Sequence, residues 1–156
     1  MSNPTTITAE PGLPFVDTVR EFDAPVGAVF RAHTDRDLYG RWVGLRDYPI
    51  EISEFDATAG GRWAYLVRGD DGMTFGFRGV FHTVDADALL VHTFEFDGTP
   101  GQVGLSLTTF EALDGRTRIS VREVYPSVEV RDAAVASGME YGVVEGYQRL
   151  DELLAG

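Results

Sequence analysis

The sequence predicts an α+β fold in which a seven-stranded, curved antiparallel sheet surrounds a long C-terminal helix, with two short helices after the first strand. From Tyr48 onward, apolar residues alternate with a period of two, and turn-forming residues recur about every ten to twelve positions, as in an antiparallel meander. After Pro126 the apolar period becomes helical. The 156 residues suffice for one domain with one core.

The first fourteen residues, MSNPTTITAEPGLP, are rich in Pro, Thr and Gly and show no periodicity. This composition is typical of a mobile tail, so we expect residues 1–14 to be disordered and a single domain to cover residues 15–156. Residues Phe15 to Phe22 alternate and contain Val, Thr and Phe, which predicts the first strand.

Two short helices are predicted directly after this strand. Ala24-Pro25 places a proline in a first helical turn, where its missing N–H costs nothing. The acidic segment 35–37 (DRD) suits the N-terminus of a second helix, and Gly40 is expected to end it.

The last hairpin carries the strongest turn signal, Asp114-Gly115, which suits a two-residue turn with positive φ. That turn places Glu111 opposite Arg118, an opposite-charge cross-strand pair. The register is therefore supported by charge as well as by the turn.

The strand before this turn does not alternate cleanly. Leu105, Leu107 and Phe110 can share one face only if the strand contains an extra residue. We therefore predict a β-bulge at Thr108-Thr109.

The C-terminal helix is predicted from a stripe of apolar residues spaced by four, four, three and four positions, after Ser127 as N-cap. The stripe consists of Met139, Val143, Tyr147, Leu150 and Leu154. Gly138 is expected to interrupt the helix. Gly142 and Gly146 are expected to let its backbone approach the sheet closely.

Composition excludes several classes of function. The 25 acidic residues outnumber the 13 basic ones, so nucleic acid and anionic membrane surfaces are not expected as partners. The chain has no cysteine, which excludes thiol nucleophiles, disulfides and thiolate-bound metals. All basic residues are arginine, which excludes a lysine Schiff base. No signal-peptide pattern or membrane span is evident, so a cytoplasmic location is expected.

Several local patterns, in this order, resemble one known group. They are Ala24-Pro25 to Phe30, Thr34-Asp35, Trp42, Gly60-Gly61-Arg62-Trp63, Gly79, Thr93-Phe94-Glu95, Gly115-Arg116-Thr117-Arg118, and the ending Gly138 to Leu154. The chain is similar to the START-like (SRPBCC) superfamily, also called the polyketide cyclase or birch-pollen-allergen-like group, over roughly residues 15–155. It resembles most the single-domain bacterial homologues of the heat-shock-protein-90 ATPase activator.

The resemblance implies a helix-grip fold and a role like that of bacterial ligand carriers or sensors. The activator itself also depends on a separate N-terminal domain, for which we expect no room in this chain. Fold analogy alone does not establish a function.

Signatures of catalysis and metal binding are weak. The segment 104–108 (GLSLT) lacks the final glycine of a serine-hydrolase elbow and lies in a predicted strand. His82 and His92 lie on adjacent predicted strands and would face one another across an odd-length loop, but no third ligand is evident. We therefore expect no metal, no cofactor and no assigned catalytic residue.

Aromatic residues give the best functional signal, because they alternate on three neighbouring predicted strands and would share one face. They form either a solid core or the wall of a cavity between sheet and helix. The predicted ligand-binding residues are Trp42, Trp63, Tyr65, Phe75, Phe77, Phe81, His92, Phe94, Phe96, Glu123, Met139, Val143 and Tyr147.

His92, Glu123 and Tyr147 are the polar members of this set and are expected to orient a ligand. A buried Glu123 must pair, protonate or contact water. Arg78 and Arg122 are expected to point to solvent.

Three functions stay open. The first is binding of a small hydrophobic molecule by a carrier or sensor. The second is an enzyme of cyclase, hydratase or hydrolase type, with His92 or Glu123 as general base. The third is a protein-interaction role, either co-chaperone-like or through a homodimer.

Overall fold

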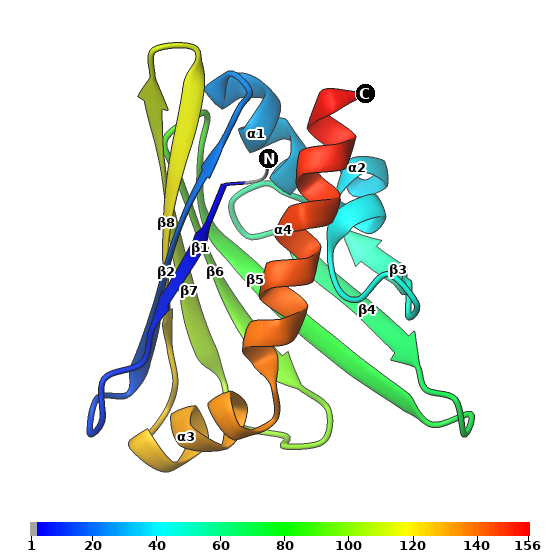
Figure 1. Ribbon diagram of the computed structural model, residues 1–156. Coiled ribbons are helices and arrows are strands. Elements are labelled where there is room, and N and C mark those ends of the chain that lie inside the picture. Colours follow the sequence, from blue (N-terminus) through cyan, green and yellow to red (C-terminus); the bar gives the residue numbers. More distant parts are fainter. Residues whose placement is uncertain (1–2) are drawn as a thin grey trace.

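The computed structural model describes residues 3–156, which form one open antiparallel sheet of eight strands and four helices (Figure 1). The strands are β1 (Thr5–Thr8), β2 (Phe15–Phe22), β3 (Ile50–Phe55), β4 (Arg62–Arg68), β5 (Thr74–Asp85), β6 (Leu89–Phe96), β7 (Gly104–Leu113) and β8 (Arg116–Val124). The helices are α1 (Val26–Thr34), α2 (Arg36–Trp42), α3 (Val128–Ala136) and α4 (Met139–Ala155).

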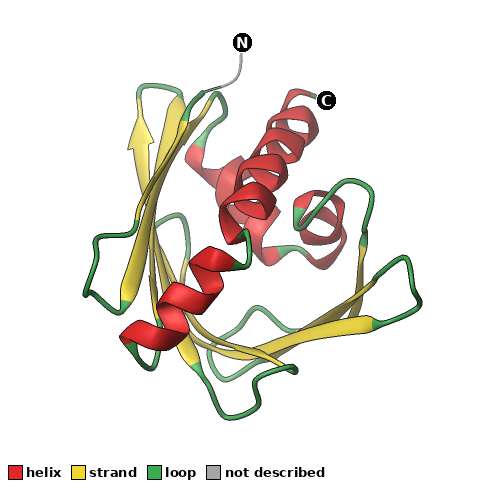
Figure 2. Cartoon of the chain, turned by 60° about the horizontal axis from the view of Figure 1, so that its bottom comes forward, coloured by secondary structure: helices red, strands yellow, loops and turns green. Residues whose placement is uncertain are grey.

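The sheet has the strand order β1-β2-β8-β7-β6-β5-β4-β3 and bends around α4 (Figures 1 and 2). The α1 and α2 helices lie at one end of α4, and α3 lies at the other (Figure 1). We call the side of the sheet that faces α4 the inner face. This is the predicted helix-grip architecture, with eight strands where the sequence predicted seven.

The additional strand lies in the segment predicted to be a mobile tail. Residues Thr5–Thr8 pair with the edge of β2, with Thr5 opposite Arg20 and Thr8 opposite Asp17. Thr and Ile favour strands, but four residues are too few to show a period, and their partner is a distant sheet edge. Order therefore begins well before Phe15. Residues 1–2 of the predicted tail lie outside the described residues.

The β7–β8 hairpin has the predicted register, and the Arg118 guanidinium donates to the Glu111 carboxylate at 2.6 Å. The predicted β-bulge at Thr108-Thr109 is wrong, because this pairing runs without a shift from one end to the other. Leu105 and Leu107 instead lie on the outer face.

The inner face of β7 consequently carries Ser106 and Thr108, which are each only 5% exposed. The apolar pattern of this strand misled the prediction because small polar residues point inward here.

The predicted helix boundaries are mostly confirmed. Ser127 caps α3 by accepting a hydrogen bond from the Val130 N–H at 3.1 Å, and Gly138 separates α3 from α4 with φ 88°. Gly40, however, does not end α2. The helix continues to Trp42, whose buried indole donates to the Ala32 carbonyl at 2.8 Å. This tertiary anchor outweighs the roughly 1 kcal/mol that a helical glycine costs.

The hydrophobic core lies between the sheet, α1, α2 and the C-terminal half of α4. Phe22, Ile119 and Leu150 are fully buried in it. The ring of Tyr147 stacks on Trp42 at 5.8 Å and meets Phe22 edge-on at 5.5 Å. This half of α4 is therefore fixed by aromatic packing.

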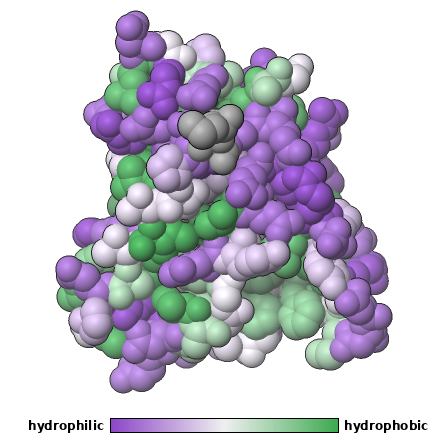
Figure 3. Space-filling model, viewed as in Figure 1, coloured by the Kyte–Doolittle hydropathy of each residue, from purple (hydrophilic) through white to green (hydrophobic). Residues whose placement is uncertain are grey.

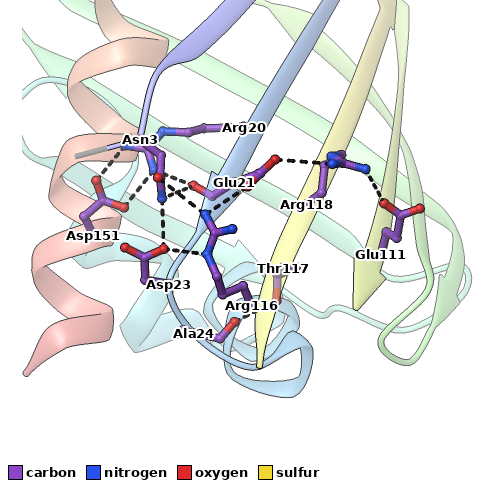
Figure 4. A network of polar contacts seen from close by, with 10 residues as sticks. All are labelled: Asn3, Arg20, Glu21, Asp23, Ala24, Glu111, Arg116, Thr117, Arg118 and Asp151. Atoms are coloured by element: carbon purple, nitrogen blue, oxygen red, sulfur yellow. Dashed lines mark hydrogen bonds and ion pairs between the residues drawn. The ribbon is translucent and has the colours of Figure 1, made fainter. Parts of the chain in front are cut away.

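A buried ion pair adds to this anchorage (Figure 4). Arg20 lies on the inner face of β2, is 1% exposed, and donates to both carboxylate oxygens of Asp151 on α4 at 2.8 and 2.6 Å. Nearby, Thr117 donates to the Ala24 carbonyl at 2.8 Å, and Arg116 pairs with Asp23 at 2.9 Å. These contacts join α4, β2 and the start of α1.

The two glycines of α4 do not act as predicted. A Cβ at Gly146 would lie 3.3 Å from the Trp42 carbonyl oxygen, so this glycine brings α4 close to the end of α2, not to the sheet. A Cβ at Gly142 would meet no atom of the described residues within 4 Å. The N-terminal half of α4 therefore stands away from its neighbours at this point.

Candidate functional site

One row of side chains crosses the inner face in direct register. Glu123 on β8 is opposite Ser106 on β7, Ser106 is opposite His92 on β6, and His92 is opposite Phe81 on β5. Residues paired in this way point to the same side of a sheet. The fold thus places the predicted polar residues Glu123 and His92 on one face, with only β7 between them.

The aromatic residues form a continuous wall beside this row. Trp63 stacks on Tyr65 at 5.6 Å, Tyr65 meets Phe77 at 5.4 Å, Phe77 stacks on Phe96 at 5.1 Å, and Phe96 stacks on Phe75 at 6.3 Å. The alternation on β4, β5 and β6 therefore brings these rings together on the inner face, as expected.

Two glycines let large rings lie against the backbone of the sheet. A Cβ at Gly104 would collide with the ring of Phe94, and a Cβ at Gly79 would collide with the indole of Trp63. Phe94 also meets Tyr125 edge-on at 5.4 Å. The rings of Trp63 and Phe94 therefore lie close to the strand backbone.

The predicted site residues fall into two groups. Trp42 and Tyr147 belong to the packed core, and Trp63 and Phe81 are also buried. Phe75 is 38% exposed near the free end of β5. The other predicted site residues are only partly buried. Together with Tyr125 they form a set that we call the open inner face, and two of its members lie on α4 itself. These residues are Tyr65, Phe77, His92, Phe94, Phe96, Glu123, Tyr125, Met139 and Val143.

The surface view agrees with an apolar region at this place. Hydrophobic side chains gather beside and below the hydrophilic outer surface of α4 (Figure 3). Met139 contacts the hydroxyl of Tyr125 through its sulfur at 3.6 Å, which closes the α3–α4 end of this region.

Glu123 is the unusual group of the open inner face. Burial raises its pKa to about 7, and within residues 3–156 its carboxylate has no hydrogen-bond or ion-pair partner. Glu123 was expected to pair, protonate or contact water, and no pairing is observed among the described residues.

Four tyrosines lie near enough to this carboxylate for its charge to affect them. Burial raises the pKa of Tyr39, Tyr65, Tyr125 and Tyr147, and the nearby charge of Glu123 raises each of them further. The phenols come from α2, β4, the residue after β8, and α4. Four separate elements thus bring phenols into the neighbourhood of one carboxyl group.

Sequence reasoning missed three members of this site. Tyr125 continues the inward parity of β8 two residues beyond Glu123, so the alternation itself contained the signal. Ser106 was assigned outward by the wrong bulge. Tyr39 lies on a helix too short to show a clear period, and only the packing of α2 brings it to the site.

A small cavity lies next to the row. Its volume is about 30 Å³, close to that of one water molecule. The residues that line it are His33, Tyr39, Phe55, Trp63, Phe81, Leu90, His92 and Thr108. The buried indole N–H of Trp63 has no acceptor among residues 3–156. Ligand pockets are typically ten or more times larger, so this cavity alone would not hold a ligand.

The two histidines of this cavity are uncharged at neutral pH. Burial lowers the pKa of His33 to about 4, and it also lowers the pKa of His92. His82 lies apart from them, because it is exposed at the register shift in β5 and contacts Thr83. His82 and His92 therefore do not face one another, and no group of three or more metal-ligating residues occurs within the described chain.

A larger hollow of about 550 Å³ opens on the surface near the end of α4, far from the aromatic wall. Its acidic groups are already engaged, since Asp151 pairs with Arg20, Glu152 with Arg46 and Asp23 with Arg116. It has no aromatic wall and its charged groups are engaged in ion pairs, so it is not the candidate site.

A family model described as Activator of Hsp90 ATPase homolog 1-like protein matches residues 23–155. The chain belongs to this family. No functionally curated protein matches it. The predicted resemblance to bacterial START-like proteins is confirmed.

Solved structures show the same fold over nearly the whole chain. A Rhodobacter sphaeroides protein is 25% identical with a TM-score of 0.87, and the match covers 97% of this chain and 98% of that one. An Arthrobacter aurescens protein is 26% identical with a TM-score of 0.87, covering 96% and 91%. DynU16, from the dynemicin biosynthetic locus, is 21% identical with a TM-score of 0.68, covering 91% of this chain and 47% of that one. Among the described residues, no helix has the length and apolar character needed to cross a membrane.

Proposed function

We propose that this protein binds a small, largely apolar molecule on the open inner face, beneath the N-terminal half of α4, as a carrier or sensor. The observation that carries the proposal is Glu123, a partly buried carboxyl group without a partner among the described residues, set among tyrosines. Leaving such a group unpaired destabilises the fold, and groups of this kind concentrate at functional sites.

The aromatic wall supplies the affinity in this proposal. Tyr65, Phe77 and Phe94 present partly exposed rings, and covering apolar surface contributes about 25 cal/mol per Å² before the costs of association. Glu123 and the phenols supply orientation. A few polar groups in an apolar surface are the usual composition of a ligand site.

The test is a thermal-shift screen of apolar and aromatic compounds, followed by calorimetry on those that stabilise the protein. A ligand at a hundred times its Kd stabilises the folded state by about 2.7 kcal/mol. Ser106→Leu would place bulk in the middle of the row and should abolish binding. Thr109→Leu, on the outer face of the same strand, is the matched control and should bind normally. The proposal fails if no compound stabilises the wild type, or if the two variants bind alike.

A second candidate is acid–base catalysis of cyclase, hydratase or hydrolase type on the same ligand. It is favoured by the pKa of Glu123, about 7, because a general acid or base works best near the ambient pH. Glu123→Gln would then retain binding and lose turnover. Turnover by that variant at the wild-type rate would exclude Glu123 as the catalyst.

A co-chaperone-like role and a homodimer stay predictions, as does a cytoplasmic location. Sedimentation and a pull-down with the bacterial chaperone test the first two directly. A monomer without chaperone affinity would remove both.

A further inference from the structure

We infer that the ligand of the open inner face carries a protonated amine, which binds against the carboxyl group of Glu123. This inference rests on the proposed function and adds the chemical class of the ligand.

No described cation is available on the inner face to receive an anionic ligand. The chain contains arginine as its only basic side chain apart from histidine, and the two buried arginines are already bound. Arg20 holds both oxygens of Asp151, and Arg131 binds Asp132 at 2.7 Å and the Glu10 carbonyl at 3.0 Å.

The arginines of the neighbouring strands point the other way. Arg78 pairs with Glu95 and Arg122 with Asp17 on the outer face, where both arginines are exposed. A fatty acid, phosphate ester or other anion would thus meet Glu123 without a counter-charge. The charge pattern therefore favours cationic ligands over acidic ones.

The surroundings of Glu123 suit a cation in two further ways. Rings of tyrosine attract ammonium groups through their negative faces, and this attraction strengthens where water is removed. Within residues 3–156 the hydroxyls of Tyr39, Tyr65 and Tyr147 have no hydrogen-bond partner, so their oxygens are free to accept N–H donors. An ammonium group would give the carboxylate the partner that the described chain does not provide.

The groups that face Glu123 predict the pH dependence. They are Tyr39 from α2, Tyr65 from β4, Tyr125 after β8, Tyr147 from α4, and His92 from β6 in the same row. The tyrosines keep their protons and His92 stays neutral in the neutral range. Among these groups, the carboxyl group of Glu123 has the pKa that lies at about 7.

An ammonium ligand requires the ionised carboxylate, so binding must release the proton of Glu123 at low pH. With a pKa of about 7 in the free protein, the Kd of an amine should be about tenfold larger at pH 6 than at pH 8. A neutral ligand of the same shape should show no such dependence.

The experiment compares three probes that share one ring system: 2-(2-naphthyl)ethylamine, 2-(2-naphthyl)ethanol and 2-naphthylacetate. Their affinities for the full chain are measured by calorimetry at pH 6 and pH 8, and the phenyl analogues are measured in parallel. We expect the amine to bind at least tenfold more tightly than the alcohol at pH 8, and the carboxylate to bind most weakly.

Two variants localise the effect. Glu123→Gln should bind amine and alcohol equally and lose the pH dependence. Glu140→Gln, which removes the same charge from an exposed position on α4, should behave like the wild type. The wild-type pH dependence tests the inference independently of how well Glu123→Gln folds.

The outcomes separate the two proposals. If the alcohol or the carboxylate binds as tightly as the amine, or if Glu123→Gln keeps the amine preference, the inference is overturned and the proposed function stands. If none of the naphthyl or phenyl probes binds, the proposed function is contradicted, and the inference falls with it.

Discussion

Glu123 shows how one residue can set the pH response of the site. Its pKa is about 7 in the folded protein and 4.5 ordinarily. Between these values the folded state holds a proton that the unfolded state has released, so stability falls as pH rises through this window. Glu123→Gln, which never ionises, should be more stable than the wild type by about 1 to 3 kcal/mol at pH 8 and equal to it near pH 4.5.

Urea unfolding at these two pH values measures the difference. Glu140→Gln is the control for a change in net charge and should show no comparable gain. A Glu123→Gln variant that is equally stable or less stable at pH 8 would mean that the carboxylate has a favourable partner.

The two bidentate arginine–aspartate pairs differ in burial and should differ in how much each contributes to the free energy of unfolding. Arg20 is 1% exposed where it binds Asp151, whereas Arg122 is 51% exposed where it binds Asp17 at 2.8 and 2.9 Å. Asp151→Asn leaves a buried guanidinium without its counter-charge and should cost about 2 to 4 kcal/mol. Asp17→Asn should cost less than about 1 kcal/mol. Equal losses in denaturant unfolding would show that burial is not the deciding factor.

For single helices and strands, the sequence pattern predicted the features that depend on which side of the element is buried. The alternation of β4 to β6 and the stripe of α4 follow from one buried side per element, so they could be found in the sequence. Segment Thr5–Thr8 could not, because its strand depends on a free edge of β2. The inward direction of Ser106 was missed for a related reason, since the space above it is created by other elements.

The glycines of α4 give an element-scale prediction. Alanine is favoured over glycine by about 1 kcal/mol within a helix, and Gly142 has open space around its Cβ position. Gly142→Ala should therefore stabilise the protein by about 0.5 to 1 kcal/mol. At Gly146 the added methyl would press on the Trp42 carbonyl at 3.3 Å, so Gly146→Ala should gain little or lose stability. Matched unfolding curves check this, and an equal gain at both positions would place Gly146 away from α2.

For the whole molecule, two buried groups oppose one another in the acid range. The pKa of His33 is about 4 in the folded protein and 6.5 ordinarily, so the unfolded state binds more protons between these values and stability falls as pH falls. Glu123 acts in the opposite direction over nearly the same range. The wild type should therefore change little in stability between pH 4.5 and 6.5.

Removing one of the two groups should reveal the other. In Glu123→Gln the free energy of unfolding should rise by about 1 to 3 kcal/mol from pH 4.5 to 6.5, because His33 is then unopposed. Chemical unfolding at several pH values measures both slopes. Identical slopes in variant and wild type would contradict the opposition of the two groups.

The candidate site was predictable only in part, because some of its residues are brought together by packing between distant elements. The aromatic wall and Glu123 follow from strand parity, whereas Tyr39 arrives from α2 and the open space depends on where α4 is anchored. Trp42 was predicted at the site but packs against the ring of Tyr147 in the core, because helix positions are set by tertiary contacts that the sequence period does not specify.

The small inward residues of β7 have a consequence for comparing relatives. Ser106 and Thr108 are small polar residues on the buried face of the sheet, and the ring of Phe94 occupies the place that a side chain at Gly104 would need. Larger residues at 106 and 108 would extend over the inner face and add apolar contacts, so selection for stability alone would enlarge them. In a family alignment, the sizes of the residues at positions 106 and 108 should therefore indicate how much internal volume each relative has. Relatives with bulky residues there are expected to fold well and to have lost the capacity to carry a guest.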